Sequence, residues 1–132
     1  MRNQNREFEF KVWCEFEING KIETRMEEAC SWFMITQTGK LWSYGPTSRP
    51  HPLEKEYKKA IPLFYVGLKD KQGEKIFECD IVKHARAGNK AEEIGEVWIS
   101  ASQGVMVGNW PASFDLEILG NIFENPELLE RP

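Results

Sequence analysis

The sequence predicts a mainly β protein with an N-terminal hairpin lobe, a small C-terminal barrel and one short terminal helix. Three observations support this class. Apolar and polar residues alternate over a long N-terminal stretch, and short apolar runs recur at close spacing between turn signals further along. The 132 residues are 41% hydrophobic and 12% aromatic, which is enough for a packed core without a metal or disulfide staple.

The N-terminal alternation is the strongest strand signal in the chain. Every second residue from 8 to 18 is apolar, which is the period of a strand with one buried face. Asn19-Gly20 supplies the two positive-φ positions of a type I′ turn, so residues 21–26 are expected to return as the partner strand. Trp13 falls on the opposite, wet face. The side chains expected in the core are Phe8, Phe10, Val12, Cys14, Phe16 and Ile18.

The pattern loosens after this hairpin. Residues 32–36 fit a short helix or a strand, and the turn signal Thr38-Gly39-Lys40 before residues 41–44 favours a second hairpin. Segment 45–52 contains three prolines, which lack the N–H that a central strand needs, so it is expected to be a loop or linker. Residues 54–60 are expected to form one or two helical turns that end at Pro62.

The second half predicts a series of short strands and then a helix. We expect residues 83–93 to form a polar loop, because the small residues in it argue against burial. Asn125 and Pro126 predict a short terminal helix, with Asn125 as its N-cap and Glu127 at its positive end. The expected strands lie at residues 64–68, 76–77, 81–82, 96–100, 105–110 and 114–122, the last of them broken near Gly120.

The distribution of cysteine and histidine does not suggest a cofactor or a metal site. Cys14, Cys30 and Cys79 are odd in number and widely spaced, which predicts three reduced thiols, and His51 and His84 have no ligand spacing around them. No apolar run approaches the roughly 20 residues of a membrane span, and the N-terminus is polar. We therefore expect a cytosolic protein with no membrane partner.

A group of four carboxylates, at Asp70, Glu74, Glu78 and Asp80, is the nearest approach to a catalytic site. Paired carboxylates can divide acid and base roles or hold a hard cation. Lysines interleave with these four, however, which is typical of a solvated turn with local ion pairs. We expect no catalytic residues, and an unrecognised enzyme at this turn is the third hypothesis for function.

Charge is unevenly distributed along the chain, whose formal net charge is -4. Residues 1–48 carry 6 basic and 7 acidic groups, residues 49–90 carry 10 and 6, and residues 91–132 carry 1 and 8. The basic middle third could bind phosphates, although the acidic chain as a whole argues against nonspecific duplex binding. The candidate nucleic-acid contacts are Lys58, Lys59, Lys83, Arg86 and Lys90.

The same asymmetry allows assembly, because a basic third and an acidic third can attract each other across copies or meet a partner of matching charge. Trp13, Trp42 and Trp110 are candidate protein contacts, since aromatic residues are enriched at hot spots. The alternative is that each indole covers a second sheet or the interface between lobes.

Two blocks of the sequence resemble a known family. Residues 65–83, YVGLKDKQGEKIFECDIVK, resemble the segment that marks the YopX family of bacteriophage and prophage proteins, and residues 119–129, LGNIFENPELL, resemble its C-terminal signature. The N-terminal FKVW, residues 10–13, followed by Met26, is a fainter third match.

The resemblance implies a small phage-encoded protein without enzymatic activity, located in the cytoplasm of the bacterial host. It also implies an SH3-like barrel at 61–132, preceded by a separate β-rich lobe at 1–60. Where the family has glycine, this chain has Cys79. A positive φ there costs a side chain about 1 kcal/mol, so we expect the turn to be less strained than the family pattern suggests.

The first hypothesis is therefore a phage- or prophage-encoded, non-enzymatic accessory protein that acts through protein contacts. Its partner is expected to be a host or phage protein or a second copy of the chain. The alternative is a nucleic-acid-binding accessory protein that uses the basic middle third.

Overall fold

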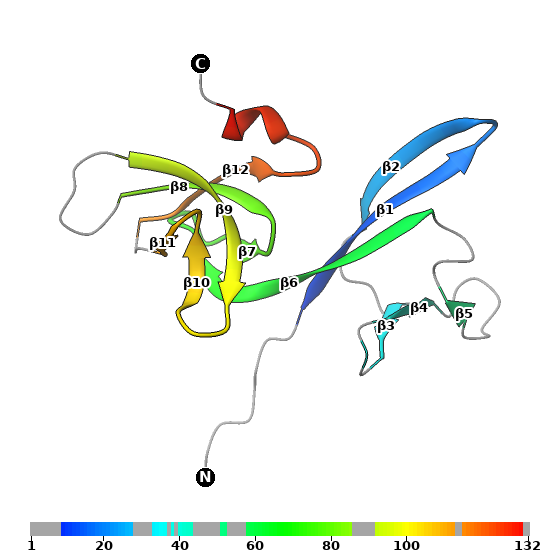
Figure 1. Ribbon diagram of the computed structural model, residues 1–132, viewed down its shortest axis with the longest axis horizontal. Coiled ribbons are helices and arrows are strands. Elements are labelled where there is room, and N and C mark those ends of the chain that lie inside the picture. Colours follow the sequence, from blue (N-terminus) through cyan, green and yellow to red (C-terminus); the bar gives the residue numbers. More distant parts are fainter. Residues whose placement is uncertain are drawn as a thin grey trace, which may run out of the picture. The chain divides into compact units, whose positions relative to one another are not determined.

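The structure is a computed structural model (Figure 1). It describes residues 9–27, 33–36, 38, 40–43, 51–52, 58–85, 92–112 and 115–130. These residues are predominantly strand, which confirms the predicted mainly β class. The chain divides into two compact units at Leu63 and Phe64. We call Glu9–Leu63 the N-terminal unit and Phe64–Pro132 the half-barrel unit.

The N-terminal unit begins with the predicted hairpin. Strands β1 (Phe10–Ile18) and β2 (Lys21–Glu27) pair antiparallel, from Ile18 opposite Lys21 to Val12 opposite Glu27. Asn19 and Gly20 have φ values of 52° and 79°, the pair of positive angles that a type I′ turn requires. The prediction of the strands and of their turn is confirmed.

The buried side of this hairpin differs from the prediction. Val12 and Cys14 are buried as expected and pack with Leu41, while Phe10 is only partly buried and Ile18 is exposed. Trp13, predicted on the wet face, is only 5% exposed, so that prediction is wrong. Burial follows position along the strand and not the face alone, because three consecutive residues from Val12 to Cys14 are buried while the end at the turn is exposed. Phe8 lies outside the described residues.

A small three-stranded sheet completes the N-terminal unit, in the order β3 (Phe33–Ile35), β4 (Leu41–Ser43) and β5 (His51–Pro52). The first two strands form the predicted second hairpin. His51–Pro52 was expected in a loop but pairs with β4 as a two-residue edge strand. Proline is tolerated at a sheet edge, where its missing N–H breaks no ladder bond.

Strand β6 (Lys59–Lys69) occupies residues 59–60, the end of the segment where helical turns were expected. It passes through Pro62 without ending there, because its apolar and aromatic run favours a strand. The N–H of Lys58 donates to the carbonyl of Glu15 on β1, at 2.7 Å. β6 neighbours β1 in the N-terminal unit and pairs with β7 in the half-barrel unit. Residues 53–57 lie outside the described part of the chain.

The half-barrel unit is built on a curled five-stranded antiparallel sheet (Figure 1). Its strand order is β11-β10-β9-β8-β12, and a short strand β7 (Lys75–Phe77) pairs with β6. Its core cluster is formed by Ile76, Val82, Val97, Val107 and Leu116. The five strands are β8 (Asp80–Ala85), β9 (Glu92–Ser100), β10 (Gly104–Val107), β11 (Trp110–Pro111) and β12 (Glu117–Asn121).

The polar loop expected at 83–93 has strand at both of its ends, in its described residues 83–85 and 92–93. His84 pairs with Glu93 and Ala85 pairs with Glu92, so β8 and β9 continue well into that segment. The small side chain of Ala85 does not prevent this pairing, since backbone hydrogen bonds need no large side chain. The register shift between Ile118 and Gly120 confirms the predicted break in the last strand. Residues 86–91 lie outside the described residues.

The chain ends in a 3₁₀ helix, η2 (Pro126–Leu129), as predicted in position and in its leading proline. Asn125 does not cap it with its side chain. The Asn125 Oδ1 atom instead accepts a hydrogen bond from the N–H of Asn121, at 3.2 Å, and it packs against Gly120, where a Cβ would not fit. In the described part of the chain, no helix has the length and apolarity that crossing a membrane requires.

Candidate functional site

The first candidate, the acidic turn, is built around Asp70. This side chain is 7% exposed, and its Oδ1 accepts hydrogen bonds from the N–H groups of Gln72 and Glu74, at 2.9 and 3.0 Å. Its Oδ2 accepts from the N–H of Ile118, at 3.3 Å. Burial alone raises the pKa of this carboxyl, but the three backbone donors and Lys71 outweigh it and hold the pKa below its usual range.

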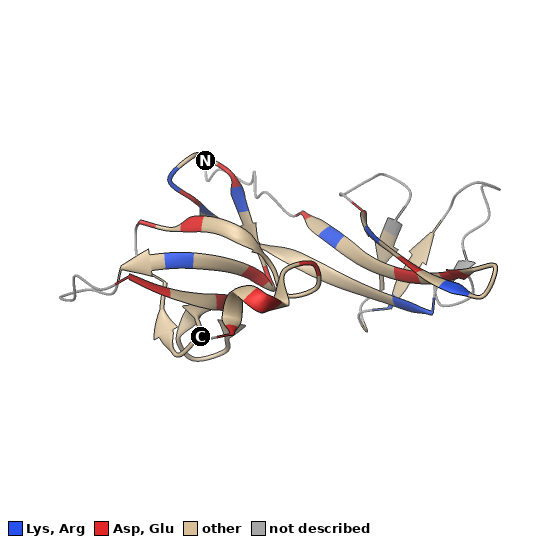
Figure 2. Ribbon diagram, turned by 90° about the horizontal axis from the view of Figure 1, so that it is seen from above, with Lys and Arg blue, Asp and Glu red and all other residues tan. Residues whose placement is uncertain are grey.

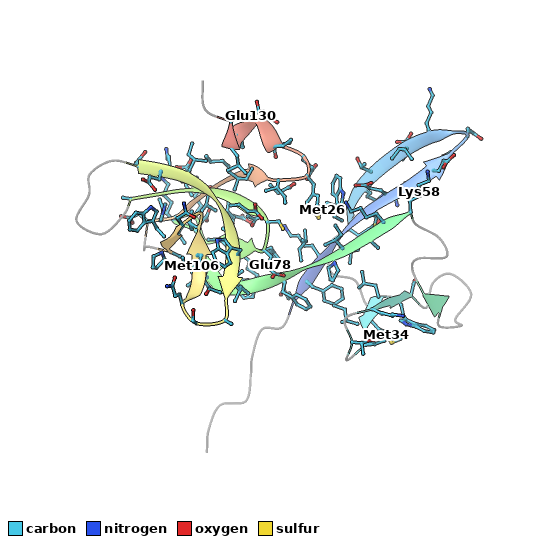
Figure 3. The ribbon with its side chains drawn as sticks, in the orientation of Figure 1. Met26, Met34, Lys58, Glu78, Met106 and Glu130 are labelled. Atoms are coloured by element: carbon cyan, nitrogen blue, oxygen red, sulfur yellow. The ribbon has the colours of Figure 1, made fainter. Side chains whose placement is uncertain are left out.

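Two of the other three carboxylates also bind backbone. Glu78 Oε1 accepts from the N–H of Phe64 at 2.9 Å, and Figure 3 shows Glu78 beside β6. Asp80 Oδ2 accepts from the N–H of Phe77, at 2.8 Å, whereas Glu74 is exposed. Three of the four carboxylates, those of Asp70, Glu78 and Asp80, therefore accept hydrogen bonds from the backbone, whereas the sequence predicted solvated side chains with local ion pairs. Among the described residues, no group of His, Cys, Asp or Glu could hold a metal ion.

The turn at Cys79 keeps a left-handed backbone, with φ at 70°, so the expectation of a relaxed turn is wrong. Its N–H donates to the carbonyl of Val97 at 2.9 Å, and its carbonyl accepts from the N–H of Ile122 at 3.0 Å. Burial, and then the charge of Glu96, raises the pKa of the Cys79 thiol to about 11. Burial also raises the pKa of Cys14 to about 11. Both thiols are free and protonated at neutral pH.

The predicted nucleic-acid contacts do not lie in one unit. Lys58 and Lys59 belong to the N-terminal unit, whereas Lys83 belongs to the half-barrel unit, and Arg86 and Lys90 lie outside the described residues. Figure 2 shows acidic and basic positions intermixed along the described strands of both units.

Two of these lysines are also engaged by carboxylates. Lys58 Nζ lies 2.8 Å from Glu17 Oε2. Lys83 Nζ lies 3.4 Å from Glu92 Oε2 and 3.6 Å from Glu117 Oε1. Hydrogen bonding and charge from Lys71, together with Lys83, hold the pKa of Glu117 below its usual value. These pairs reduce the positive charge that Lys58 and Lys83 present to a phosphate.

The three predicted tryptophan contacts have different environments. Trp13 is buried, and its Nε1 donates to Glu15 Oε2 at 3.0 Å, while Trp42 on β4 is partly buried. Trp110 is 45% exposed on β11. The structure adds two residues that the sequence analysis did not assign to protein contact, Ile94 and Trp98, which are 46% and 42% exposed. Their four-residue spacing on one strand face was the available signal.

A pocket of about 200 Å³ lies next to Trp110 in the half-barrel unit. Trp110 and Ile94 are among its lining residues, the buried His84 lines it from β8, and most of the lining surface is polar. Glu93 and Asn109 add a carboxylate and an amide to the lining. The pocket therefore combines an aromatic ring with polar groups, from elements that are distant in the sequence.

The turn at Gly108-Asn109 is held against β9 from two sides. The N–H of Gly108 donates to the Glu96 carbonyl at 2.9 Å, and the Gly108 carbonyl accepts from Trp98 Nε1 at 2.7 Å. Gly95 permits this approach, because a Cβ there would lie 2.9 Å from the Gly108 nitrogen. Since Ile94 and Trp110 line one pocket and Trp98 binds the turn between them, we call these three residues the aromatic surface.

Comparisons with known proteins found a matching family model and similar solved structures. A family model described as YopX protein matches residues 10–130. The crystal structure of yopX from Bacillus subtilis is 21% identical, with a TM-score of 0.55, and the match covers 92% of this chain and 98% of that one. Protein EF1440 from Enterococcus faecalis is 18% identical, with a TM-score of 0.52, covering 96% and 100%. At these identities the two structures show the fold alone. The comparison with curated proteins gave no match.

Proposed function

The chain belongs to the YopX family, and on that premise we propose that it is a phage- or prophage-encoded accessory protein that acts through protein contacts and not as an enzyme. The proposed place of action is the cytoplasm of the bacterial host, and the proposed partner is a host or phage protein or a second copy of the chain. The observation that carries this proposal is the aromatic surface formed by Ile94, Trp98 and Trp110.

Two properties of the aromatic surface suit it to a protein contact. Large exposed apolar groups gathered in one place are unfavourable in water, and tryptophan is the residue type most enriched at binding hot spots. The surface is also held in place, because Trp98 Nε1 donates to the carbonyl of the turn that precedes Trp110. A surface that is ordered before binding loses less conformational entropy when a partner arrives.

The proposal of a non-enzymatic role has its own support in the chemistry of the described side chains. Asp70, Glu78 and Asp80 accept hydrogen bonds from backbone N–H groups, which are structural tasks. The thiols of Cys14 and Cys79 have pKa values raised to about 11, and a protonated thiol is a poor nucleophile. None of these groups has the environment of an activated catalytic residue.

Quantitative affinity capture from phage-infected bacterial cells tests this proposal. The full chain serves as bait, beside a Trp98→Ala/Trp110→Ala variant and an Ile22→Ala control at an exposed position in the N-terminal unit. Circular dichroism first checks that each bait is folded. We expect the wild type and the control to retain the same proteins and the double variant to lose them.

Equal capture by all three baits would contradict the proposal. Capture that disappears after nuclease treatment would instead favour the nucleic-acid alternative.

A further inference from the structure

Strand β2 has one edge without a neighbour among the described strands. Its sheet has the order β2-β1-β6-β7, so β2 is the terminal strand (Figure 1). Residues 21–25 are exposed, and the pairing with β1 runs without a register shift from Lys21 to Glu27. The segment also contains no proline. An exposed and regular edge of this kind is a template on which another strand can add.

The backbone groups on this edge belong to every second residue. A two-residue turn is closed by a hydrogen-bonded pair, here Ile18 and Lys21, and such pairs alternate with non-bonded pairs along an antiparallel ladder. The odd-numbered residues of β2 therefore bond to β1. The N–H and C=O groups that point outward are those of Ile22, Thr24 and Met26. A second copy of β2 can bond to this edge only in registers that align the same outward positions.

The side chains of β2 are complementary to those of a second β2 strand that runs antiparallel about Thr24. In that register, every charged side chain faces one of opposite sign, and the apolar side chains face each other. The pairs are Lys21 with Glu27, Ile22 with Met26, Glu23 with Arg25, and Thr24 with Thr24 of the other copy. Opposite charges and apolar groups directly across two strands stabilise the pairing.

The two neighbouring registers, which keep the same kind of backbone bonding, bring like charges together. With the axis at Glu23, this residue faces itself and Lys21 faces Arg25. With the axis at Arg25, this residue faces itself and Glu23 faces Glu27. Like charges directly opposite are destabilising. The charges on this edge therefore select the alignment about Thr24.

We propose that β2 pairs antiparallel with β2 of a second copy of this chain, with the two-fold axis at Thr24. Arg25 Nη1 lies 2.9 Å from Glu27 Oε1 of its own strand, and the guanidinium lies over the Phe16 ring. A guanidinium has five N–H donors, so Glu23 of the second copy can add to these contacts without replacing them. A seven-residue strand pair is smaller than a standard interface, so we expect a weak dimer.

Charge exchange across the axis tests the inference, by sedimentation velocity of the full chain at about 10 to 500 µM. Glu23→Arg places an arginine opposite Arg25, and Arg25→Glu places a glutamate opposite Glu23. We expect each single variant to raise the dissociation constant of the dimer about tenfold or more, because the altered pair occurs twice in a symmetric dimer. Glu23→Arg/Arg25→Glu restores opposite charges and should return the constant to within about threefold of the wild type.

A mixture of the two single variants provides a second arm. An equimolar mixture of Glu23→Arg and Arg25→Glu has opposite charges at both pairs, so we expect it to form the dimer where neither variant does alone. Glu74→Arg is the matched control, since it makes the same charge change at an exposed position outside β2 and should leave the constant within about twofold. Circular dichroism checks that every variant is folded.

Amide hydrogen exchange at increasing protein concentration locates the contact on β2. We expect exchange to slow at the outward N–H groups of Ile22, Thr24 and Met26, because these groups gain hydrogen bonds in the dimer. The N–H groups of Glu23 and Arg25 point toward β1 in the monomer and should change little.

Three results would each overturn the inference: a wild type that stays monomeric at the highest concentration, folded single variants whose mixture does not dimerise, or unchanged exchange at the three outward N–H groups. The first of these would leave a strand of a different protein as the occupant of the edge. The inference goes beyond the proposed function and does not depend on it, because capture from infected cells tests the aromatic surface of the half-barrel unit.

Discussion

Cys79 occupies a backbone conformation that favours glycine, and the surrounding hydrogen bonds impose that conformation. With φ at 70°, the residue carries a strain of about 1 kcal/mol. Its N–H and its carbonyl are bound to Val97 and Ile122, so relaxing the angle would break two backbone hydrogen bonds, each contributing about 1 kcal/mol. Retaining the strain therefore costs less than relieving it.

A pair of substitutions at position 79 measures this strain. Cys79→Gly and Cys79→Ala both remove the thiol, but only glycine adopts the left-handed angle without cost. We expect Cys79→Gly to have a free energy of unfolding about 1 kcal/mol higher than Cys79→Ala, measured by urea denaturation followed by tryptophan fluorescence. Equal stabilities of the two variants would show that the turn carries no strain.

Asp70→Asn tests the structural role of the acidic turn. Asparagine cannot accept through its NH₂ group, so at least one of the three backbone donors loses its acceptor. We expect a loss of roughly 1–3 kcal/mol in the free energy of unfolding at pH 7.

The effect of Asp70→Asn depends on pH in a definite direction. The folded-state pKa of Asp70 is lowered, so its stabilising contribution is full above the unfolded-state pKa and is lost as the pH falls through the folded-state pKa. The difference between wild type and Asp70→Asn should therefore narrow below about pH 4. A gap that is constant from pH 7 to pH 2 would contradict this assignment.

These residue roles lay beyond prediction from sequence for a physical reason. Carboxylates interleaved with lysines have the same sequence pattern whether they are solvated or bound to backbone. The hydrogen bond from Ile118 to Asp70 joins residues 48 positions apart, so the folded topology, and not the local pattern, decides the role. The family resemblance indicated a glycine position at Cys79, but we expected a relaxed turn there, and the left-handed backbone was not predicted.

At the scale of elements, local sequence patterns predicted which strands pair more accurately than they predicted which side chains are buried. The alternation before Asn19-Gly20 predicted β1, β2 and the turn, because turn chemistry and register are local properties. The buried Trp13 and the exposed Ile18 were not predictable, since their environments depend on which other elements cover the hairpin. Strand β6 includes residues 59–60, where the end of a helical segment was expected, because sheet pairing overrides a weak local preference.

The stabilities of the Val12→Ala and Ile22→Ala variants compare a buried position of the hairpin with an exposed one. Val12 is fully buried against Cys14 and Leu41, so we expect its truncation to lower the free energy of unfolding by about 1–3 kcal/mol. Ile22 on β2 is exposed, and its truncation should cost less than about 1 kcal/mol. Urea denaturation measures both losses, and a larger loss for Ile22→Ala would mean that the core of this unit is assigned wrongly.

The pocket beside Trp110 could not be predicted from any one segment. Its lining comes from β8, from β9 and from the turn between β10 and β11. The turn approaches β9 only because Gly95 has no Cβ, and a glycine inside a strand pattern does not by itself reveal what approaches it. The sequence identified Trp110 as a candidate contact but not the groups that surround it.

At the scale of the whole molecule, charge complementarity between copies predicts self-association. If the acidic last third meets the basic middle third of another copy, sedimentation velocity at 0.1 M salt should detect a species larger than 15.4 kDa. Lys58→Glu/Lys59→Glu should shift it toward monomer, whereas Lys40→Glu, at an exposed position before β4, should not.

The salt dependence of this self-association distinguishes attraction between surface charges from contacts between aromatic side chains. Because the Debye length falls from roughly 10 Å at 0.1 M salt to 3 Å at 1 M, dissociation at high salt indicates surface charges. Association that persists at high salt indicates aromatic anchors. A monomer at every concentration and salt would leave only a different protein as the partner.

The most direct test of the central claim is amide hydrogen exchange, measured on the free protein and on the purified complex with its captured partner. The claim is that the aromatic surface of the half-barrel unit makes the contact. We predict that exchange in the complex slows most at residues 93–98 and 107–111, around Ile94, Trp98 and Trp110. Slowing confined to the N-terminal unit, or to β8 and β12 around Lys83, with no change in those two segments, would contradict the account.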